Sequence, residues 1–346
     1  MHGSRYQLQI ENGERQGPIL DRNGDPVVNS NGTELRGAVL DHESITQRNF
    51  GTVALATMVA RGVEQVMHPA IGGAVEYVSD FWNGPIGRVY RSMPPILNVV
   101  YANDLEAWGE QIRDYHKNIK GFDEKGRGFH ALHTEPFYWA HDTFVDANRR
   151  IAEHYNPRPF TQADRHQLQL ESNTWYSRYS MPMGIVPGSD EEYRQWRADI
   201  VQNKLEMTPS ADRAINMIME GKLPLHEVVP RQFRGLARAA LMPVSEAARI
   251  FGIGEMSEDI RERFAIPFSD DDQQKLDDLR GVSRLLWKRV PAPLLYNGEA
   301  YDARLRETGG KHRNTIDHMT YMGMSIGTTV LKRTVSTARS LSPIKF

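Results

Sequence analysis

Four of the chain's 12 histidines fall within residues 111–146, at His116, His130, His133 and His141. Histidine can bind a metal ion, hold haem iron, or complete a buried core through a hydrogen bond. The 346 residues include no cysteine, which excludes disulfides, thiolate zinc sites, cysteine-held iron–sulfur clusters and cysteine nucleophiles. The histidines are therefore the first residues to consider for chemistry.

The spacing of the histidines excludes two common metal sites. No histidine lies four residues from another, so the zinc-binding sequence H-E-x-x-H does not occur. No histidine follows a glutamate by three residues, which the helical di-iron carboxylate proteins require. His130 and His133 form H-x-x-H in a predicted loop without further ligands nearby, and we interpret them as polar loop residues.

His116 and His141 differ from the other two because each is predicted to lie on a helix beside an apolar stripe. Ile112 lies one turn before His116, and Phe137 and Phe144 bracket His141 on one helix face. A buried neutral imidazole needs a hydrogen-bond partner or a metal. Each residue can thus be a satisfied core histidine or a ligand to haem iron in an apolar pocket.

The elements that must position these residues are predicted to be helices. From about residue 46 the apolar residues recur with a helical period, and strand-like alternation is scarce. The sequence predicts an all-α fold with a single large helical domain of roughly ten helices over residues 46–310. Predicted helices cover 103–121, 134–155, 161–179, 189–206, 209–220, 231–252, 257–264 and 270–288, with others between 44 and 101.

Both ends of the chain differ in amino-acid composition from this helical domain. Residues 1–45 are polar and contain Asn-Gly twice, which predicts an irregular arm or a hairpin. The pair Pro94-Pro95 should end or kink the helix that begins at Pro85. Residues 311–346 are rich in methionine and small residues, and could dock on the body, on a second subunit or on a membrane surface.

Composition narrows the class of partner. The net charge is -2 with 25% charged residues, so there is no basic excess to neutralise nucleic acid. The N-terminus lacks the apolar region of a signal peptide, and no apolar run reaches the length of a membrane span. We therefore expect a soluble cytoplasmic protein.

Several segments in order resemble one known family. These are "HPAIGGAVEYVSDFWNGPIGRVYRS", "HKNIKG", "FYWAHDTF", "TQADRHQLQLE", "MPVSEAARIFGI" and "WKRVPAPLLYNGEAYDARLRE". The series, over roughly residues 50–308, resembles the family that unites latex-clearing rubber oxygenases with the oxygenase of mycophenolic acid biosynthesis. The resemblance implies an all-α fold that binds haem b and an oxygenase that uses dioxygen on carbon–carbon double bonds of isoprenoid chains.

The resemblance also implies roles for individual residues. By order along the chain His116 matches the proximal ligand of the haem iron, with His141 as the alternative. Arg88 and Ser92 match a pair near the haem, and Arg91 lies between them at a cofactor-binding position. A fixed guanidinium can hold a carboxylate or polarise dioxygen, and a serine hydroxyl can donate a hydrogen bond on the distal side.

Some matches depart from the family pattern and leave alternatives open. Arg91 stands where the rubber-cleaving branch can have a lysine that binds the iron, and a guanidinium does not become a ligand. Ser92 replaces the usual threonine. Glu76 or Glu171 could act as a base. The alternative function is a non-catalytic haem-binding or sensing protein, or a haem-free helical module that binds a lipid or partner.

Overall fold

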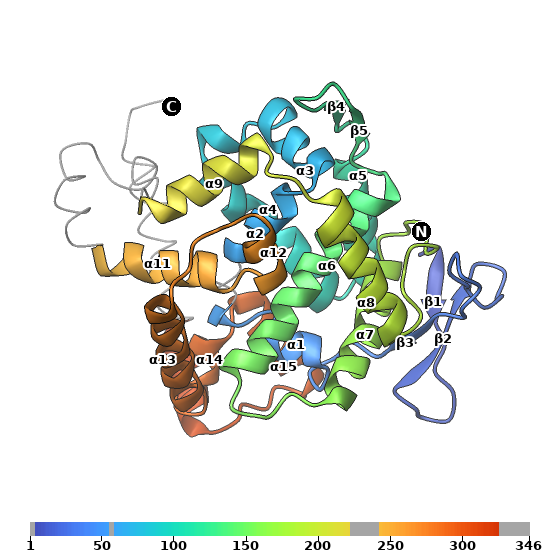
Figure 1. Cartoon of the computed structure of the whole chain (residues 1–346). Helices are drawn as coiled ribbons and strands as arrows, with labels where there is room; N and C mark the ends of the chain where they lie inside the picture. Colours follow the sequence, from blue (N-terminus) through green and yellow to red (C-terminus); the bar gives the residue numbers. More distant parts are fainter. Residues whose placement is uncertain (1–3, 55–58, 222–241, 325–346) are drawn as a thin grey trace, which may run out of the picture.

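The computed structural model describes residues 4–54, 59–221 and 242–324, and they form a mostly helical domain (Figure 1). This confirms the predicted fold class, with more helices in the described residues than the roughly ten expected. The α-helices are α1 (Ile45–Asn49), α2 (Val59–Val66), α3 (Pro69–Gly73), α4 (Pro85–Tyr101), α5 (Leu105–Tyr115), α6 (Thr134–Arg150), α7 (Gln162–Ser177), α8 (Asp190–Asp199), α9 (Pro209–Met219), α11 (Met242–Gly254), α12 (Glu258–Arg263), α13 (Asp270–Trp287), α14 (Ala292–Leu295) and α15 (Gly298–Glu307). Part of the predicted helix 231–252 lies outside the described residues.

Three of these helices end in a π-helical turn, in which each backbone N–H bonds five residues back. Segment η2 (Ala74–Val78) extends α3, η4 (Ile151–Tyr155) extends α6, and η5 (Ile200–Lys204) extends α8. A short 3₁₀ turn, η3 (Phe81–Asn83), precedes α4. The α-helical part of α6 ends at Arg150 and that of α8 at Asp199. The predicted helices 134–155 and 189–206 run further because they include the π-helical turns η4 and η5.

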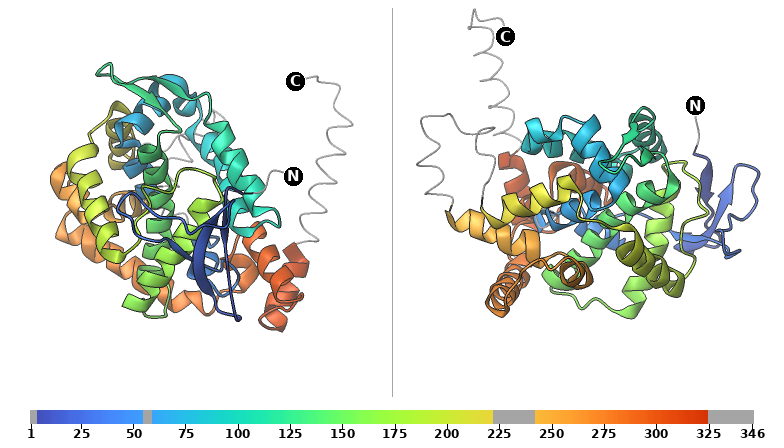
Figure 2. Two further views of the ribbon diagram at one scale, coloured as in Figure 1. Left: turned by 90° about the vertical axis from the view of Figure 1, so that its right-hand side faces the viewer. Right: turned by 45° about the horizontal axis from the view of Figure 1, so that its top comes forward.

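Of the two structures predicted for the N-terminal segment, an irregular arm or a hairpin, residues 4–45 contain paired strands, as in a hairpin. Strands β1 (Tyr6–Leu8), β2 (Gln16–Asp21) and β3 (Arg36–Ala38) form an antiparallel sheet in the order β1-β2-β3. Gly24 and Gly32, which end the two Asn-Gly pairs, have φ values of 88° and 80°, a left-handed conformation that favours glycine. The sheet lies at one edge of the helical body, where the backbone N–H of Ala38 donates to Thr174 on α7 (Figure 2).

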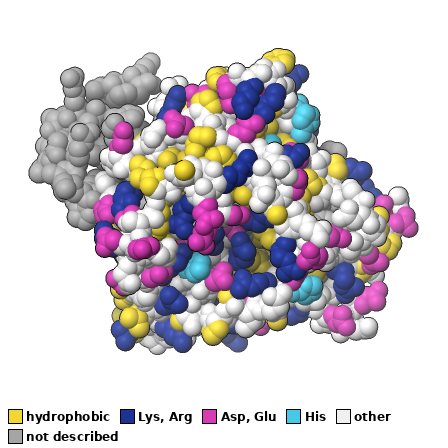
Figure 3. Space-filling model, viewed as in Figure 1, with side chains coloured by type: hydrophobic (Ala, Val, Ile, Leu, Met, Phe, Trp, Pro, Cys, Tyr) yellow, Lys and Arg dark blue, Asp and Glu magenta, His cyan; other side chains and the backbone are white. Residues whose placement is uncertain are grey.

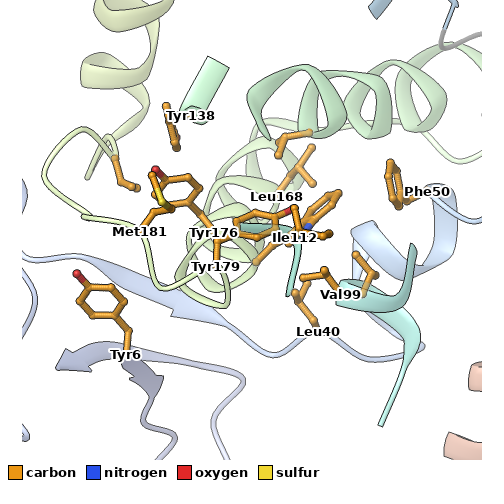
Figure 4. Packing of buried hydrophobic residues seen from close by; sticks show 14 of the residues in the cluster. Tyr6, Leu40, Phe50, Val99, Ile112, Tyr138, Leu168, Tyr176, Tyr179 and Met181 are labelled. Atoms are coloured by element: carbon orange, nitrogen blue, oxygen red, sulfur yellow. The ribbon is translucent and has the colours of Figure 1, made fainter. Parts of the chain in front are cut away.

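The helices bury two apolar clusters. The first joins α1, α4, α5, α6 and α7, and Figure 4 shows Ile112 among Leu168, Tyr176 and Tyr179. The second cluster joins α2, α6, α9 and α11 around Trp139, which has no exposed surface. Burial of these large side chains supplies the main driving force for assembly of the helices.

Helix α4 continues through Pro94 and Pro95 to Tyr101. Of the two effects predicted for this proline pair, a helix end is therefore wrong, and a kink stays a prediction. Pro94 and Pro95 have no N–H to donate to the carbonyls of Tyr90 and Arg91. Both of those residues are exposed, which lets solvent hydrate the two carbonyls. Buried side chains from Leu97 to Tyr101 then hold the second half of the helix.

Helix α5 ends at Tyr115, so the predicted continuation to Gly121 is wrong. Gly121 belongs instead to a short hairpin of β4 (Lys120–Phe122) and β5 (Gly128–His130), where it pairs with Phe129. A Cβ atom on Gly121 would come within 3.1 Å of the Phe129 ring. The close approach of this ring to the backbone favours glycine in a strand here.

A buried ionic network joins helices that are distant in the sequence. The guanidinium of Arg61 on α2 pairs with Glu64 on the same helix and with Asp146 on α6, and it donates to the carbonyl of Glu255. Ser257, before α12, accepts a hydrogen bond from Arg197 on α8 at 2.8 Å. The network thereby fixes how α2, α6, α8 and α12 pack.

Within the described ranges, no helix is long and apolar enough to cross a membrane. Of the methionine-rich segment predicted at 311–346, residues 315–324 are helical, and residues 325–346 lie outside the described part of the chain.

Candidate functional site

Arg88 and Ser92 lie one turn apart on α4 and are both half-buried. Because residues at i and i+4 share a helix face, the two polar groups present a guanidinium and a hydroxyl on one surface. Among the described residues, the Arg88 side chain has no acidic partner. Arg91 is exposed and likewise has no acidic partner in the described part of the chain.

His116 caps the C-terminus of α5, one residue past the end of the helix. Its Nδ1 lies 2.7 Å from the carbonyl oxygen of Ile112, one turn back. A carbonyl can only accept, so Nδ1 carries the proton and Nε2 carries the lone pair. No described residue hydrogen-bonds to Nε2. Metal-ligating histidines are typically held in this way, with one ring nitrogen donating to the protein and the other left to bind.

The surroundings of His116 keep its imidazole neutral. Burial lowers the pKa of the ring below its ordinary value of about 6.5, the bond to Ile112 opposes this, and the charge of Arg88 lowers it further. A neutral ring is the form that ligates a metal, and it persists here to a lower pH than in an ordinary histidine.

Apolar side chains complete the vicinity of His116. The Phe137 ring of α6 lies edge-on to the imidazole, with ring centres 5.7 Å apart. On α4, which packs along α5, Met93 and Ile96 are partly buried against the first apolar cluster. An imidazole nitrogen and a guanidinium that both lack a partner among the described residues, with an apolar ring beside the imidazole, fit a haem with charged propionates.

His141 lies deep in the core of the protein. Its Nε2 hydrogen-bonds to Ser172 at 3.0 Å, and the rings of Trp175 and Tyr176 lie 5.1 and 5.2 Å from its own. Nδ1 has no hydrogen-bond partner among the described residues. Aromatic rings from α6 and α7 therefore enclose this imidazole on several sides, and one of its two ring nitrogens is satisfied.

His130 and His133 do not form a metal site with each other. His130 ends strand β5 instead of lying in a loop, and both of its ring nitrogens are engaged, with the Lys117 carbonyl at 3.1 Å and the Leu132 N–H at 3.0 Å. His133 precedes α6 at its N-terminus. In the described residues no group of three or more histidine and acidic side chains could hold a metal ion. A haem needs only one such ligand, because the porphyrin supplies the others.

Glu76 and Glu171 are both engaged by the protein. Glu76 lies on η2, receives a hydrogen bond from Ser210 at 2.9 Å and pairs with Arg213 at 2.6 Å, which ties η2 to α9. Glu171 is fully buried and accepts from the backbone N–H groups of Ile45 and Thr46, at 2.9 and 2.7 Å. Glu171 thus satisfies the N-terminus of α1, and burial raises its pKa.

Two cavities lie elsewhere in the molecule. One of about 470 Å³ is lined by residues of the N-terminal turn, the loop 182–187 and Trp196. The other, of about 620 Å³, is lined by Arg197 and other charged or hydroxyl side chains. Neither cavity is lined by a histidine.

The comparison with protein-family models decides the family. The catalytic-domain model described as "ER-bound oxygenase mpaB/B'/Rubber oxygenase" matches residues 48–286. The chain belongs to this family. The match confirms the predicted resemblance and assigns an oxygenase domain, and hence an oxidoreductase, that spans α1 to α13. Neither the curated proteins nor the solved structures compared with the chain include a match.

Two groups of the candidate site in this mpaB/rubber oxygenase domain were missed from the sequence. The Ile112 carbonyl orients the His116 ring, and Phe137 packs on that ring. The spacing of Ile112 four residues before His116 is a signal for the first, since a side chain at a helix end can bond to a carbonyl one turn back. The contact with Phe137 joins two helices and has no local signal.

We expect Arg88→Ala to raise the pKa of His116 toward its ordinary value of about 6.5. Removing a nearby cation lowers the cost of protonating the imidazole, and among the described residues Arg88 is the charged group that acts on this ring. NMR titration of the histidine ring signals measures the shift. The control Arg91→Ala should leave the His116 signal unchanged, and equal shifts in both variants would contradict a specific effect of Arg88.

His141 is expected to make stability depend on pH. Burial lowers the pKa of its imidazole to about 3, whereas an unfolded histidine titrates near 6.5. Between these values the unfolded chain binds the extra proton, so this contribution is complete above about pH 6.5 and declines as the pH falls, by about 1.4 kcal/mol per unit. Urea unfolding should show a shallower pH dependence in His141→Gln. The same slope in both proteins would contradict the expected role of His141.

Proposed function

We propose that the chain is a haem b-dependent oxygenase that acts on a hydrophobic alkene, with His116 as the proximal ligand. The observation that carries this proposal is the His116 imidazole, whose Nδ1 is fixed by the Ile112 carbonyl and whose Nε2 is unpartnered among the described residues. Membership of an oxygenase family supports the reaction class. His141 is the less suitable ligand because aromatic rings enclose it.

Bound haem iron supplies the activation of dioxygen. The chain's own residues hold and orient the reactants. Nε2 of His116 binds the cofactor, and the Ile112 carbonyl prevents the ring from turning away. The guanidinium of Arg88 pairs with an anionic group of the cofactor or steadies a polar oxygen, and the Ser92 hydroxyl donates a hydrogen bond on the same helix face.

An apolar substrate fits the side chains beside these residues. Val89 lies three residues before Ser92 on α4 and is 50% exposed. Tyr115, next to His116, is also exposed. Exposed apolar side chains next to a reactive group are typical of a binding surface for an apolar ligand. We propose an isoprenoid or terpenoid alkene, whose double bond reacts with one dioxygen molecule to give two carbonyl products.

The test uses the haem-loaded full chain and a prenyl alkene under labelled dioxygen. The expected result is oxygen consumption with label in both carbonyl products. Loss of the donor in Arg88→Leu should lower turnover by about tenfold to a hundredfold, while Lys117→Leu, an exposed cation next to His116, should have little effect. A haem-loaded protein that consumes no dioxygen with any prenyl alkene would instead indicate a haem-binding or sensing protein.

A further inference from the structure

The last two turns of α13 present apolar side chains outward. Val282, Leu285 and Leu286 lie at i, i+3 and i+4 and therefore share one helix face, and Leu285 is 67% exposed. The opposite face of the helix buries Leu276 and Arg280. Leucine and valine on the outer face of a helix in water are unfavourable unless another surface covers them.

The apolar surface extends beyond α13 to a segment further along the chain. Arg313 donates to the carbonyl of Val290 at 3.0 Å, and the N–H of Ala292 donates to Asp317 at 2.9 Å. These bonds place the start of helix 315–324 beside the turn that follows α13. The resulting surface, here called the α13 patch, contains Val282, Leu285, Leu286, Leu294, Ile316 and Met319, each of them exposed.

Two carboxylates border the α13 patch: Asp278 is exposed one turn before Val282, and Asp302 accepts a hydrogen bond from Tyr321 of the segment 315–324 at 2.9 Å. The segments between these borders are basic. No acidic residue occurs between Asp278 and Glu299, or between Glu307 and Asp317. Asp317 itself is buried and paired with Arg313 at 3.0 Å, and no acidic residue follows it to the C-terminus. The exposed cations of the patch have no acidic partner among the described residues: Arg284, Lys288, Arg289 and Lys311. Figure 3 shows apolar and basic side chains side by side at its lower left, with acidic side chains above them.

We propose that the α13 patch binds the surface of a membrane that contains anionic lipids. Apolar side chains on one helix face, flanked by lysine and arginine, enter the boundary between headgroups and acyl chains, while the cations contact lipid phosphates and carboxylates. Four exposed cations without an acidic partner among the described residues are complementary to such a surface. A second copy of the chain would instead bring the same cations together and repel.

The test is co-sedimentation of the purified full chain with vesicles of two parts phosphatidylcholine to one part phosphatidylserine. Binding is expected at low salt and should weaken as salt is added, because the cations contribute through screened charges. Vesicles of phosphatidylcholine alone should bind at least about tenfold more weakly. The double variant Lys288→Glu/Arg289→Glu should lose about tenfold or more in affinity for the mixed vesicles.

A second double variant separates the contribution of the apolar side chains of the α13 patch from that of its cations. Leu285→Ser/Leu286→Ser should weaken binding at every salt concentration, since it removes apolar contacts and leaves the cations. The controls Val28→Ser and Arg36→Glu change an exposed valine and an exposed cation of the N-terminal sheet, far from α13 in Figure 1, and should bind as the wild type does.

Three results would overturn the proposal. The first is no binding to the mixed vesicles at low salt. The second is equal binding by the wild type and both patch variants. The third is a wild-type dimer in sedimentation velocity that Leu285→Ser/Leu286→Ser dissociates, which would make the patch an interface between copies. None of these results depends on haem or on oxygenase turnover.

Discussion

Replacing His116 with glycine is expected to release haem from the chain. The single protein ligand to the iron would be lost, while the Ile112 carbonyl and the apolar walls would remain. Loss of a group that merely orients a metal ligand costs about tenfold to a hundredfold in affinity, so loss of the ligand itself should cost at least about a hundredfold. Oxygenase turnover should fall with haem content.

Added imidazole distinguishes ligation from a structural effect. Free imidazole can occupy the space left in His116→Gly and should restore haem binding in that variant, whereas a misfolded protein would not respond. His130→Ala and His141→Gln serve as controls and should keep their haem. The assignment is wrong if His116→Gly retains haem as the wild type does and His141→Gln loses it.

Arg61→Met is expected to lower the free energy of unfolding by about 3–5 kcal/mol. Burial lowers the pKa of Arg61 to about 9, so the guanidinium is still charged at neutral pH. Methionine fills a similar length but removes this cation from the buried carboxylates of Glu64 and Asp146. Asp146 keeps Arg149 and Arg150 as partners, whereas the nearest cation left to Glu64 in the described part of the chain is Arg197, at 3.9 Å. Removing one partner from a buried ion pair is among the most costly changes in a protein core.

Urea unfolding measures this loss, and two further variants sharpen it. Arg194→Met removes an exposed arginine paired with Glu191, with 66% and 61% of the two side chains exposed, and should cost less than about 1 kcal/mol. Adding Glu64→Gln to Arg61→Met should recover part of the loss, because it removes the buried carboxylate whose nearest remaining cation, Arg197, is 3.9 Å away. Equal losses in Arg61→Met and Arg194→Met would show that the buried network contributes nothing beyond a surface pair.

Helices with local signals could be predicted from the sequence. Helix α7 begins at Thr161 with Asp164 three residues later, and α13 begins at Ser269 with Asp272, and both pairs form the reciprocal capping hydrogen bonds. The end of α5 could not be predicted, since Gly121 leaves the helix in order to pack against Phe129 in a hairpin. That contact depends on a residue in the partner strand and not on its neighbours.

In the candidate site, too, features with a local sequence signal could be predicted, whereas contacts between distant residues could not. Spacing on α4 predicted a shared face for Arg88 and Ser92, and order along the chain selected His116. Sequence spacing could not show the tautomer of His116, because ring orientation depends on the Ile112 carbonyl. It also could not show that Glu76 pairs with Arg213, which lies 137 residues away on α9.

The absorbance spectrum of the full chain, purified from cells supplied with ample haem, tests the central claim most directly. The predicted result is a strong Soret band with one haem per chain, which disappears in His116→Gly and returns with imidazole. A wild-type protein that is colourless as purified and takes up no haem when it is supplied would contradict the claim that His116 holds a haem.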